Sequence, residues 1–175
     1  MENWDVLDKD GNLIGKTVKR EKVYLLKGEY HLVVHIWVVG PDGRLIIQRR
    51  SDQKQFMPGE WAAHGGAAIS GETSVQAAKR ELFEEIGVEA DASRFKLIRR
   101  IKKRNSLVDV YLVRCNVPMC KLVLQQSEVA EVKKVHLNQL KKMVNSGEFH
   151  NYGKAYFDSL FSALSHRKNR LRNCR

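Results

Sequence analysis

Residues 66–88 read GAAISGETSVQAAKRELFEEIGV, and this stretch contains the signals for both ends of a short helix. Thr73 and Gln76 have the spacing of a capping box, in which the Thr73 hydroxyl accepts a hydrogen bond from the backbone N–H of Gln76. The helix is therefore expected to begin at Ser74. Gly87 predicts its end, because glycine adopts the left-handed conformation that stops a helix.

The predicted helix has an apolar face beside an acidic face. At about 100° per residue, four apolar side chains fall on one arc and should pack on a core. They are Val75, Ala78, Leu82 and Ile86. The neighbouring arc carries Glu81, Glu84 and Glu85, so three carboxylates face the same small space.

These carboxylates repel one another in the absence of a counter-ion. Glu81 has like-charged neighbours at i+3 and i+4, each costing about 0.2–0.5 kcal/mol. Glu84 and Glu85 also lie at the negative end of the helix dipole. A divalent cation removes both conflicts, and an all-oxygen ligand set suits Mg²⁺, or Mn²⁺ in its place, rather than zinc. The alternative is an acidic face that is only solvated, which the agreement of glycine, arginine and glutamate spacings disfavours.

The whole stretch resembles the Nudix box, whose pattern is G-x5-E-x7-R-E-U-x-E-E-x-G-U with U aliphatic. Every fixed position is matched in this chain. The matching residues are Gly66, Glu72, Arg80, Glu81, Leu82, Glu84, Glu85, Gly87 and Val88. The resemblance implies hydrolysis of a nucleoside diphosphate linked to another moiety, with water attacking a phosphorus of the pyrophosphate.

The resemblance also implies roles for individual residues. Glu84, Glu85 and the Gly66 carbonyl are expected to bind metal, and Glu81 is expected to act as the base or as a further ligand. Bound metal would neutralise charge on the phosphoryl oxygens and lower the pKa of a water molecule. The small-molecule diphosphate itself is the expected partner of the protein.

Residues around the box complete the predicted site. Arg80, counted with the catalytic residues, is expected to brace loop and helix through an ion pair with Glu72. His64 either reaches a phosphate from the mouth of the site or is a surface-loop histidine without a special role. Glu128 and Glu131 lie just before a predicted strand, where many Nudix proteins supply an additional metal ligand. Glu128 is preferred, and the alternative is that both are solvated.

The N-terminal third has motifs of its own. They are Asp8-Lys9-Asp10-Gly11, then His31, then RLIIQRR at residues 44–50 and PGEW at residues 58–61. Over about residues 4–61 they resemble isopentenyl-diphosphate isomerases and the hydrolase-like Nudix proteins near them. In that group an arginine pair and a downstream lysine lie near the diphosphate, and the matching residues are Arg49, Arg50 and Lys54. Surface charges at the end of a hairpin are the alternative.

The isomerase reaction itself is disfavoured by one missing residue. Those isomerases need a cysteine in a W-T-N-S-x-C-G-H segment, whereas residues 61–66 read WAAHGG and the first cysteine is Cys115. A hydrolase is therefore favoured over an isomerase. A Nudix module that only senses a ligand is a third alternative, which the intact box disfavours. Nucleotide sugars, nucleoside di- or triphosphates and isoprenoid diphosphates all remain open as substrates.

The composition indicates one domain. The 175 residues, 43% of them hydrophobic, suffice for one well-buried core but not for two. A Nudix hydrolase domain is expected over residues 1–165, followed by a basic tail at residues 166–175. The apolar run at residues 32–40 is too short to cross a bilayer and the start MENWD is no signal peptide, so a cytoplasmic location is expected. Cys115, Cys120 and Cys174 lack paired spacing and are expected to be reduced.

The net charge of +11 is compatible with a phosphate-rich ligand. Five of the positive charges lie at residues 166–175, where a frayed, solvated tail is expected. A nucleic-acid partner is not expected, because no interleaved aromatic residues or RNA-binding motif accompany the tail. A homodimer is a further expectation, since dimers are common in the family.

The remaining pattern predicts a mixed α+β sheet within the α/β class. Residues 30–39 and 45–49 are expected to form a hairpin around Asp42-Gly43. In further segments apolar and polar residues alternate, or apolar residues recur at helical spacing. Strands are expected at residues 95–101, 107–115 and 132–137, and helices at residues 138–144 and 152–164. These elements predict an α/β/α sandwich with a mixed central sheet.

Overall fold

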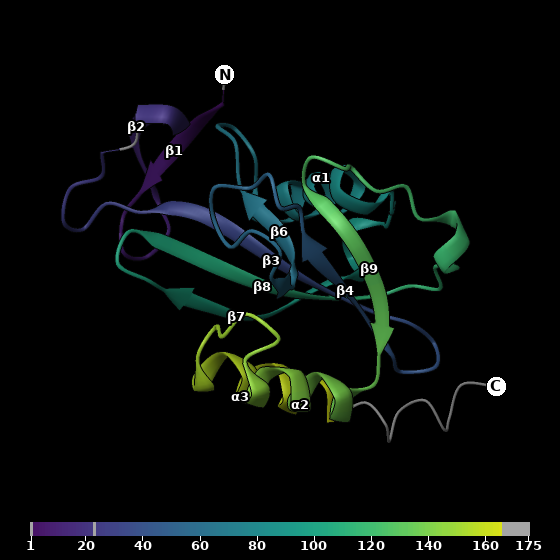
Figure 1. The fold of residues 1–175 in the computed structure, drawn as a ribbon. Coiled ribbons are helices and arrows are strands. Elements are labelled where there is room, and N and C mark those ends of the chain that lie inside the picture. The colour runs from purple at the N-terminus through teal and green to yellow at the C-terminus, as the bar shows by residue number, and fades with distance from the viewer. Residues whose placement is uncertain (1, 23, 166–175) are drawn as a thin grey trace.

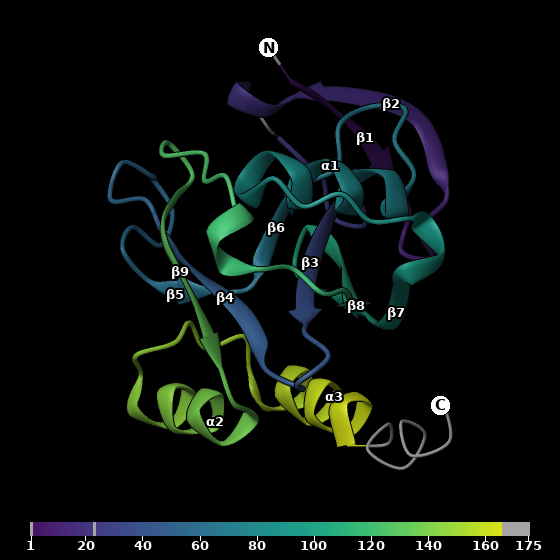
Figure 2. The ribbon, with the colours of Figure 1, turned by 90° about the vertical axis from the view of Figure 1, so that its right-hand side faces the viewer.

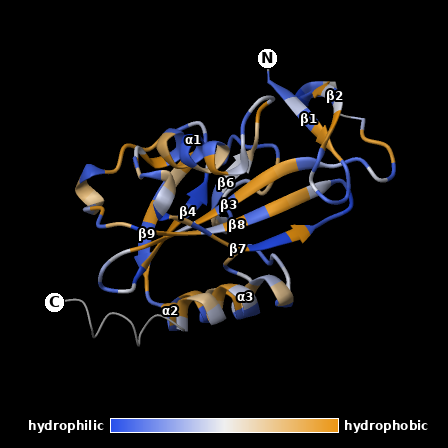
Figure 3. Cartoon of the chain, turned by 180° about the vertical axis from the view of Figure 1, so that it is seen from behind, coloured by the Kyte–Doolittle hydropathy of each residue, from blue (hydrophilic) through white to orange (hydrophobic). Residues whose placement is uncertain are grey.

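The apolar run after Tyr30 forms the central strand of the molecule. The computed structural model describes residues 2–22 and 24–165, and within them β3 (His31–Val39) pairs in parallel with β8 (Ser106–Arg114) along its full length. In Figure 3, β3 and β8 are largely orange, whereas β7 (Phe95–Lys102) at the sheet edge carries more blue. Central strands are covered on both faces and therefore need apolar side chains on both.

The β3–β4 hairpin opens into a wedge. β4 (Leu45–Arg50) pairs with β3 only beside the turn, through Val38 with Ile46 and Val39 with Leu45. Farther from the turn, β5 (Trp61–Ala62) pairs with β4 and β6 (His64–Ala67) pairs with β3. The predicted hairpin is thus confirmed at its turn, but its strands diverge and residues 61–67 lie between them.

The other strand pairs make the sheet mixed. β7 is antiparallel to β8, as expected, and β9 (Val129–Val135) is antiparallel to β4. Among the described residues these strands form one seven-stranded sheet. β9 begins three residues earlier than the predicted strand, so that Glu131 lies within it and Glu128 lies directly before it.

Helices cover both faces of the sheet (Figure 2). α1 (Ser74–Ile86) packs on one face against Val34, Ile36 and Val38, while α2 (Leu137–Ser146) and α3 (Lys154–Ser165) pack on the other, against Trp37 and Val39. This alternation along β3 is that of a strand buried on two faces. The predicted α/β/α sandwich with a mixed central sheet is confirmed.

An N-terminal hairpin was not predicted. β1 (Asn3–Leu7) and β2 (Leu13–Lys19) form a separate two-stranded sheet beside the main one (Figure 1). Asp8 closes its turn by accepting hydrogen bonds from the backbone N–H groups of Asp10 and Asn12. Three short 3₁₀ turns complete the described elements, at Arg20–Lys22, Ala92–Arg94 and Met119–Lys121.

The C-terminal tail expected at residues 166–175 lies outside the described residues, as does Cys174. Cys115 and Cys120 are free thiols. No helix in the described part of the chain has the length and apolar character needed to cross a membrane.

Candidate active site

α1 has the ends that its sequence predicts. The backbone N–H of Gln76 donates to Thr73 Oγ1 (3.4 Å), and the Thr73 N–H donates to Gln76 Oε1 (2.8 Å). Gly87 closes the helix with a φ of 71°. Because both ends are fixed locally, the three glutamates of the acidic arc have defined positions relative to the sheet.

Glu85 is the most firmly held of these glutamates. Its side chain is 3% exposed, and Oε1 accepts a hydrogen bond from Gln48 Nε2 (3.0 Å). Oε2 accepts from the backbone N–H of Gly65 (3.1 Å) and lies 3.3 Å from His64 Nδ1. Hydrogen bonds to a buried carboxylate offset its loss of hydration. Glu85 is thus fixed by Gly65 of β6 and by Gln48 of β4.

Glu81 lies against Gly66 and has an unusual pKa. A Cβ atom at Gly66 would lie only 2.5 Å from Glu81 Oε1, so the carboxylate occupies space that only glycine leaves open. Burial, followed by the charge of Glu85, raises the pKa of Glu81 to about 7 against the opposing effect of Arg80. Desolvation and a like charge both favour the protonated form of a carboxyl group.

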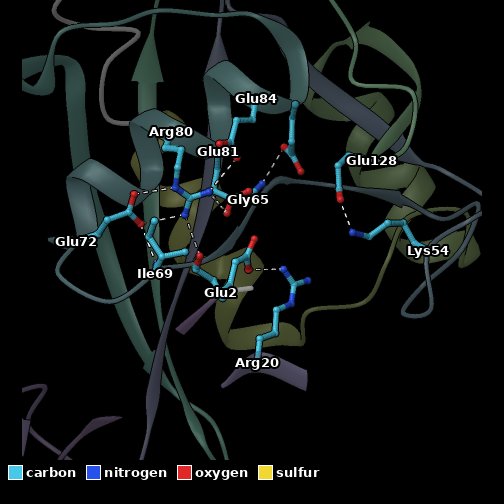
Figure 4. A network of polar contacts seen from close by, with 12 residues as sticks. Glu2, Arg20, Lys54, Gly65, Ile69, Glu72, Arg80, Glu81, Glu84 and Glu128 are labelled. Atoms are coloured by element: carbon cyan, nitrogen blue, oxygen red, sulfur yellow. Dashed lines mark hydrogen bonds and ion pairs between the residues drawn. The ribbon is translucent and has the colours of Figure 1, made fainter. Parts of the chain in front are cut away.

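Arg80 joins the acidic side chains into one network (Figure 4). It donates to Glu72 through Nε (2.7 Å) and Nη2 (3.0 Å), which is the expected ion pair. Its Nη1 also donates to Glu81 (2.9 Å) and Glu84 (3.0 Å), and Nη2 donates to the Ala67 carbonyl (3.1 Å). Arg80 therefore holds the glutamates as well as bracing the loop.

The network opens into a cavity of about 380 Å³. Glu81, Glu84 and Glu85 line one side of it. The remaining predicted site residues that line it are Gly66, Arg80, Arg50, Lys54 and Glu128. A larger hollow of about 760 Å³ beside α1 contains Arg80 but none of the three glutamates, so the smaller cavity is the candidate site.

Opposite charges face each other inside this cavity. Lys54 Nζ forms an ion pair with Glu128, and Figure 4 shows this pair to the right of Glu81 and Glu84. Arg50 donates through Nε to the Phe56 carbonyl (3.1 Å), and its terminal Nη groups have no hydrogen-bond partner within residues 2–22 and 24–165. Those free N–H groups suit an anionic ligand.

Three residues considered for the site do not line the cavity, namely Arg49, Glu131 and His64. Arg49 lies opposite Glu131 on neighbouring strands, with 3.5 Å between Nε and Oε2, and also contacts Asp52. Side chains alternate along a strand, so Arg49 and Arg50 point to opposite faces. His64 was expected near the mouth of the site, but its side chain is fully buried beside Glu85.

Several cavity residues were missed from the sequence. His35 interrupts an otherwise apolar strand, and that interruption was the available signal. Gln48 does not line the cavity, but it bonds Glu85. Trp4 and Arg20 come from the N-terminal hairpin and the turn after it, and Tyr152 precedes α3. Their approach to the cavity depends on tertiary packing, which no local pattern predicts.

The residues present fit a divalent cation. Among the described residues, no three acidic, histidine or cysteine side chains form a metal-binding group, and Arg80 is bonded to Glu81 and Glu84. The donor set is nevertheless all oxygen, as hard divalent cations require. Burial and the charge of Glu85 both raise the pKa of Glu81, and a bound cation would oppose these effects by favouring the ionised form.

Comparisons with known proteins agree with this site. The NUDIX domain family model matches residues 29–153. An uncharacterised Nudix hydrolase of Listeria monocytogenes is 37% identical over 154 residues, covering 87% of this chain and 90% of the relative. Nudix hydrolase 3 of Arabidopsis thaliana is 34% identical over 158 residues, covering 82% of this chain and 20% of the relative.

Two further similarities concern the branch and the fold. An isopentenyl-diphosphate Delta-isomerase of Halorhodospira halophila is 34% identical over 88 residues, half of each chain, which fits the resemblance of the N-terminal third. A crystal structure from Deinococcus radiodurans has a similar fold, with a TM-score of 0.71 and 24% identity over 86% of this chain and 93% of that one. With its complete box around a cavity of carboxylates, the chain belongs to the Nudix family and is a Nudix hydrolase.

Proposed function

We propose that this hydrolase uses Mg²⁺, or Mn²⁺ in its place, to cleave the pyrophosphate bond of a small molecule in which a nucleoside diphosphate is linked to another moiety. The observation that carries the proposal is one cavity lined both by the box carboxylates and by the cations Arg50 and Lys54. Carboxylates bind the metal ion, and cations bind the diphosphate. Both halves of such a substrate–metal complex have partners there.

The residues have separate tasks in this mechanism. Glu84, Glu85, Glu128 and the Gly66 carbonyl would hold the metal, with Glu81 as base or further ligand. A bound divalent cation supplies charge neutralisation at the phosphoryl oxygens and a lowered pKa of bound water.

Bond changes balance without another reactant. The water oxygen forms a bond to one phosphorus, the bridging P–O bond breaks, and the water proton passes to Glu81. Arg50 and Lys54 keep the diphosphate in line for this displacement. The leaving phosphate carries away the bridging oxygen and its electron pair.

The isomerase alternative is less well supported by the cavity. Of the two cysteines in the described part of the chain, Cys115 lies in the larger hollow beside α1 and Cys120 is exposed. Neither lines the cavity of the box glutamates. A thiol that protonates a carbon–carbon double bond would have to lie there.

A hydrolysis screen tests the proposal. The panel contains nucleoside di- and triphosphates, nucleotide sugars, dinucleotides and isoprenoid diphosphates, each with and without Mg²⁺, with phosphate and pyrophosphate release as the readout. Glu84→Gln is expected to lower the activity, and Glu89→Gln, at an exposed residue outside the cavity, is the matched control. Hydrolysis that continues in EDTA, or equal rates for Glu84→Gln and wild type, would refute the metal-dependent mechanism.

A further inference from the structure

His35 is a cavity residue to which the box assigns no role. It lies on β3 opposite Gly65 of β6, and it lines the cavity together with Tyr152 and Arg50. The Tyr152 ring packs on the imidazole, with 4.6 Å between the ring centroids, and the Tyr156 ring lies 5.6 Å away. The imidazole is therefore packed against a pair of neighbouring aromatic rings, whose own centroids lie 4.6 Å apart.

A chain of hydrogen bonds sets the tautomer of His35. Trp37 Nε1 donates to the Tyr156 hydroxyl (2.8 Å), because an indole nitrogen can only donate. The buried Tyr156 hydroxyl must then use its own hydrogen elsewhere, and the His35 Nδ1 atom lies 3.1 Å from it. A buried O–H group needs an acceptor. Nδ1 is thus the acceptor, and the proton of the neutral ring is on Nε2.

The ring is neutral as well as oriented. Burial, together with the positive charges of Lys103, His150 and Arg50, lowers the pKa of His35 to about 3. Within residues 2–22 and 24–165 no group forms a hydrogen bond with Nε2. The Nε2–H group is thus a donor whose partner is not supplied by the described protein.

We propose that His35 binds a phosphoryl oxygen of the substrate through this neutral Nε2–H group, whose tautomer is fixed by Trp37 and Tyr156. The inference rests on the proposed function, because a diphosphate is the anion for which the cavity has both cations and metal-binding carboxylates. Arg50 supplies charged donors to the same ligand. A neutral donor beside Arg50 adds a hydrogen bond without a second cation in a partly buried place.

The first experiment is on the wild-type protein and needs no variant. Long-range ¹H–¹⁵N NMR of the imidazole should show a protonated Nε2 and an unprotonated Nδ1 for His35. Addition of Mg²⁺ and methylenediphosphonate, a diphosphate analogue that cannot be hydrolysed, should shift the Nε2–H signal. A proton on Nδ1, or an Nε2–H signal that the diphosphonate leaves unchanged, overturns the proposal.

Calorimetry with the same diphosphonate measures the size of the effect. His35→Phe keeps a ring but removes the donor, and it is expected to raise Kd by about tenfold, as for one hydrogen bond to a charged group. His35→Gln should restore part of the affinity, because its amide can donate from a similar distance. His136→Phe, at the exposed N-terminus of α2, is the control and should leave Kd unchanged. Equal Kd values for wild type and His35→Phe contradict the proposal.

The two proposals can fail separately. If the wild type hydrolyses a substrate and His35→Phe has the same KM and Kd, His35 has no role in binding and the proposed function stands. If no substrate is hydrolysed but the diphosphonate binds through His35, the hydrolase proposal fails and the binding role stands. A wild type that does not bind the diphosphonate overturns the inference about His35 in either case.

Discussion

The two sides of the cavity differ in how they are built. The acidic side, Glu81, Glu84 and Glu85, comes from one helix whose spacing and ends are local. The donor side, His35, Arg50 and Lys54, comes from β3, β4 and the loop that follows β4. Its members meet only because these segments pack together in the fold. The three box glutamates thus come from a helix of thirteen residues, while the donor side is assembled across the fold.

The acidic side is itself unequal. Glu85 is buried and held by Gln48 and Gly65, whereas Glu84 is 47% exposed and is held by Arg80. A group fixed before substrate binds does not have to be ordered during the reaction. Loss of Glu85 should therefore harm the reaction more than loss of any residue on the donor side.

The largest expected effect is that of Glu85→Gln. Removal of one metal-binding charge should lower kcat/KM by about 10³-fold, because electrostatic stabilisation of the transition state is lost. Steady-state kinetics at several Mg²⁺ concentrations measure the effect, with Glu89→Gln as control. A smaller effect than that of Arg50→Ala would reverse the ranking of the two sides.

Gly66→Ala should lower kcat by about 10²-fold with little loss of stability. The new Cβ atom would lie 2.5 Å from Glu81 Oε1 and displace a base, while the free energy of unfolding should change by less than about 1 kcal/mol because a flexible side-chain end can move. Kinetics and urea denaturation measure the two quantities. Gly65→Ala is the contrast, because its Cβ would lie 1.9 Å from the Val34 carbonyl oxygen, a backbone atom. This substitution should lower the free energy of unfolding more than Gly66→Ala does.

Glu81 should also make the free energy of unfolding depend on pH. The folded-state pKa of Glu81, about 7, exceeds the ordinary carboxyl value, so the native state binds the proton more tightly than the unfolded state does. Without metal, the free energy of unfolding of the wild type should therefore fall between pH 4.5 and pH 7, by about 1–3 kcal/mol more than that of Glu81→Gln. Urea denaturation in EDTA at several pH values checks this. Parallel pH profiles for the two proteins would show that Glu81 is not perturbed.

Substitutions on the donor side should have the smallest effects on catalysis, and these effects should appear as a higher KM. Arg50→Ala or Lys54→Ala is expected to raise KM by about tenfold, since one charged hydrogen bond to phosphate is lost. Arg49→Ala should change KM less, because Arg49 contacts Asp52 and Glu131 outside the cavity. Arg44→Ala, in the exposed turn before β4, is the neutral control. A larger effect for Arg49 than for Arg50 would contradict the observed side-chain directions.

The predicted residues differ in how well their positions could be read. The acidic side was predictable because a helix has a fixed period, so Glu81, Glu84 and Glu85 had to share an arc. Arg49 and Arg50 have similar charges and adjacent positions, and only the pairing of β4 with β9 shows which of them faces the cavity. The start of β9 likewise places Glu128 at the cavity and Glu131 beside Arg49.

The sequence by itself determined the family, the helix with its two ends and the acidic face, because each follows from contacts between residues near one another in the chain. Only the tertiary structure decided that β3 and β4 diverge, that His64 is buried beside Glu85, and that His35 reaches the cavity with its Nδ1 atom beside the Tyr156 hydroxyl. These features depend on partners far away in sequence, such as Tyr156 for His35. Long-range packing sets them, and local spacing carries no information about it.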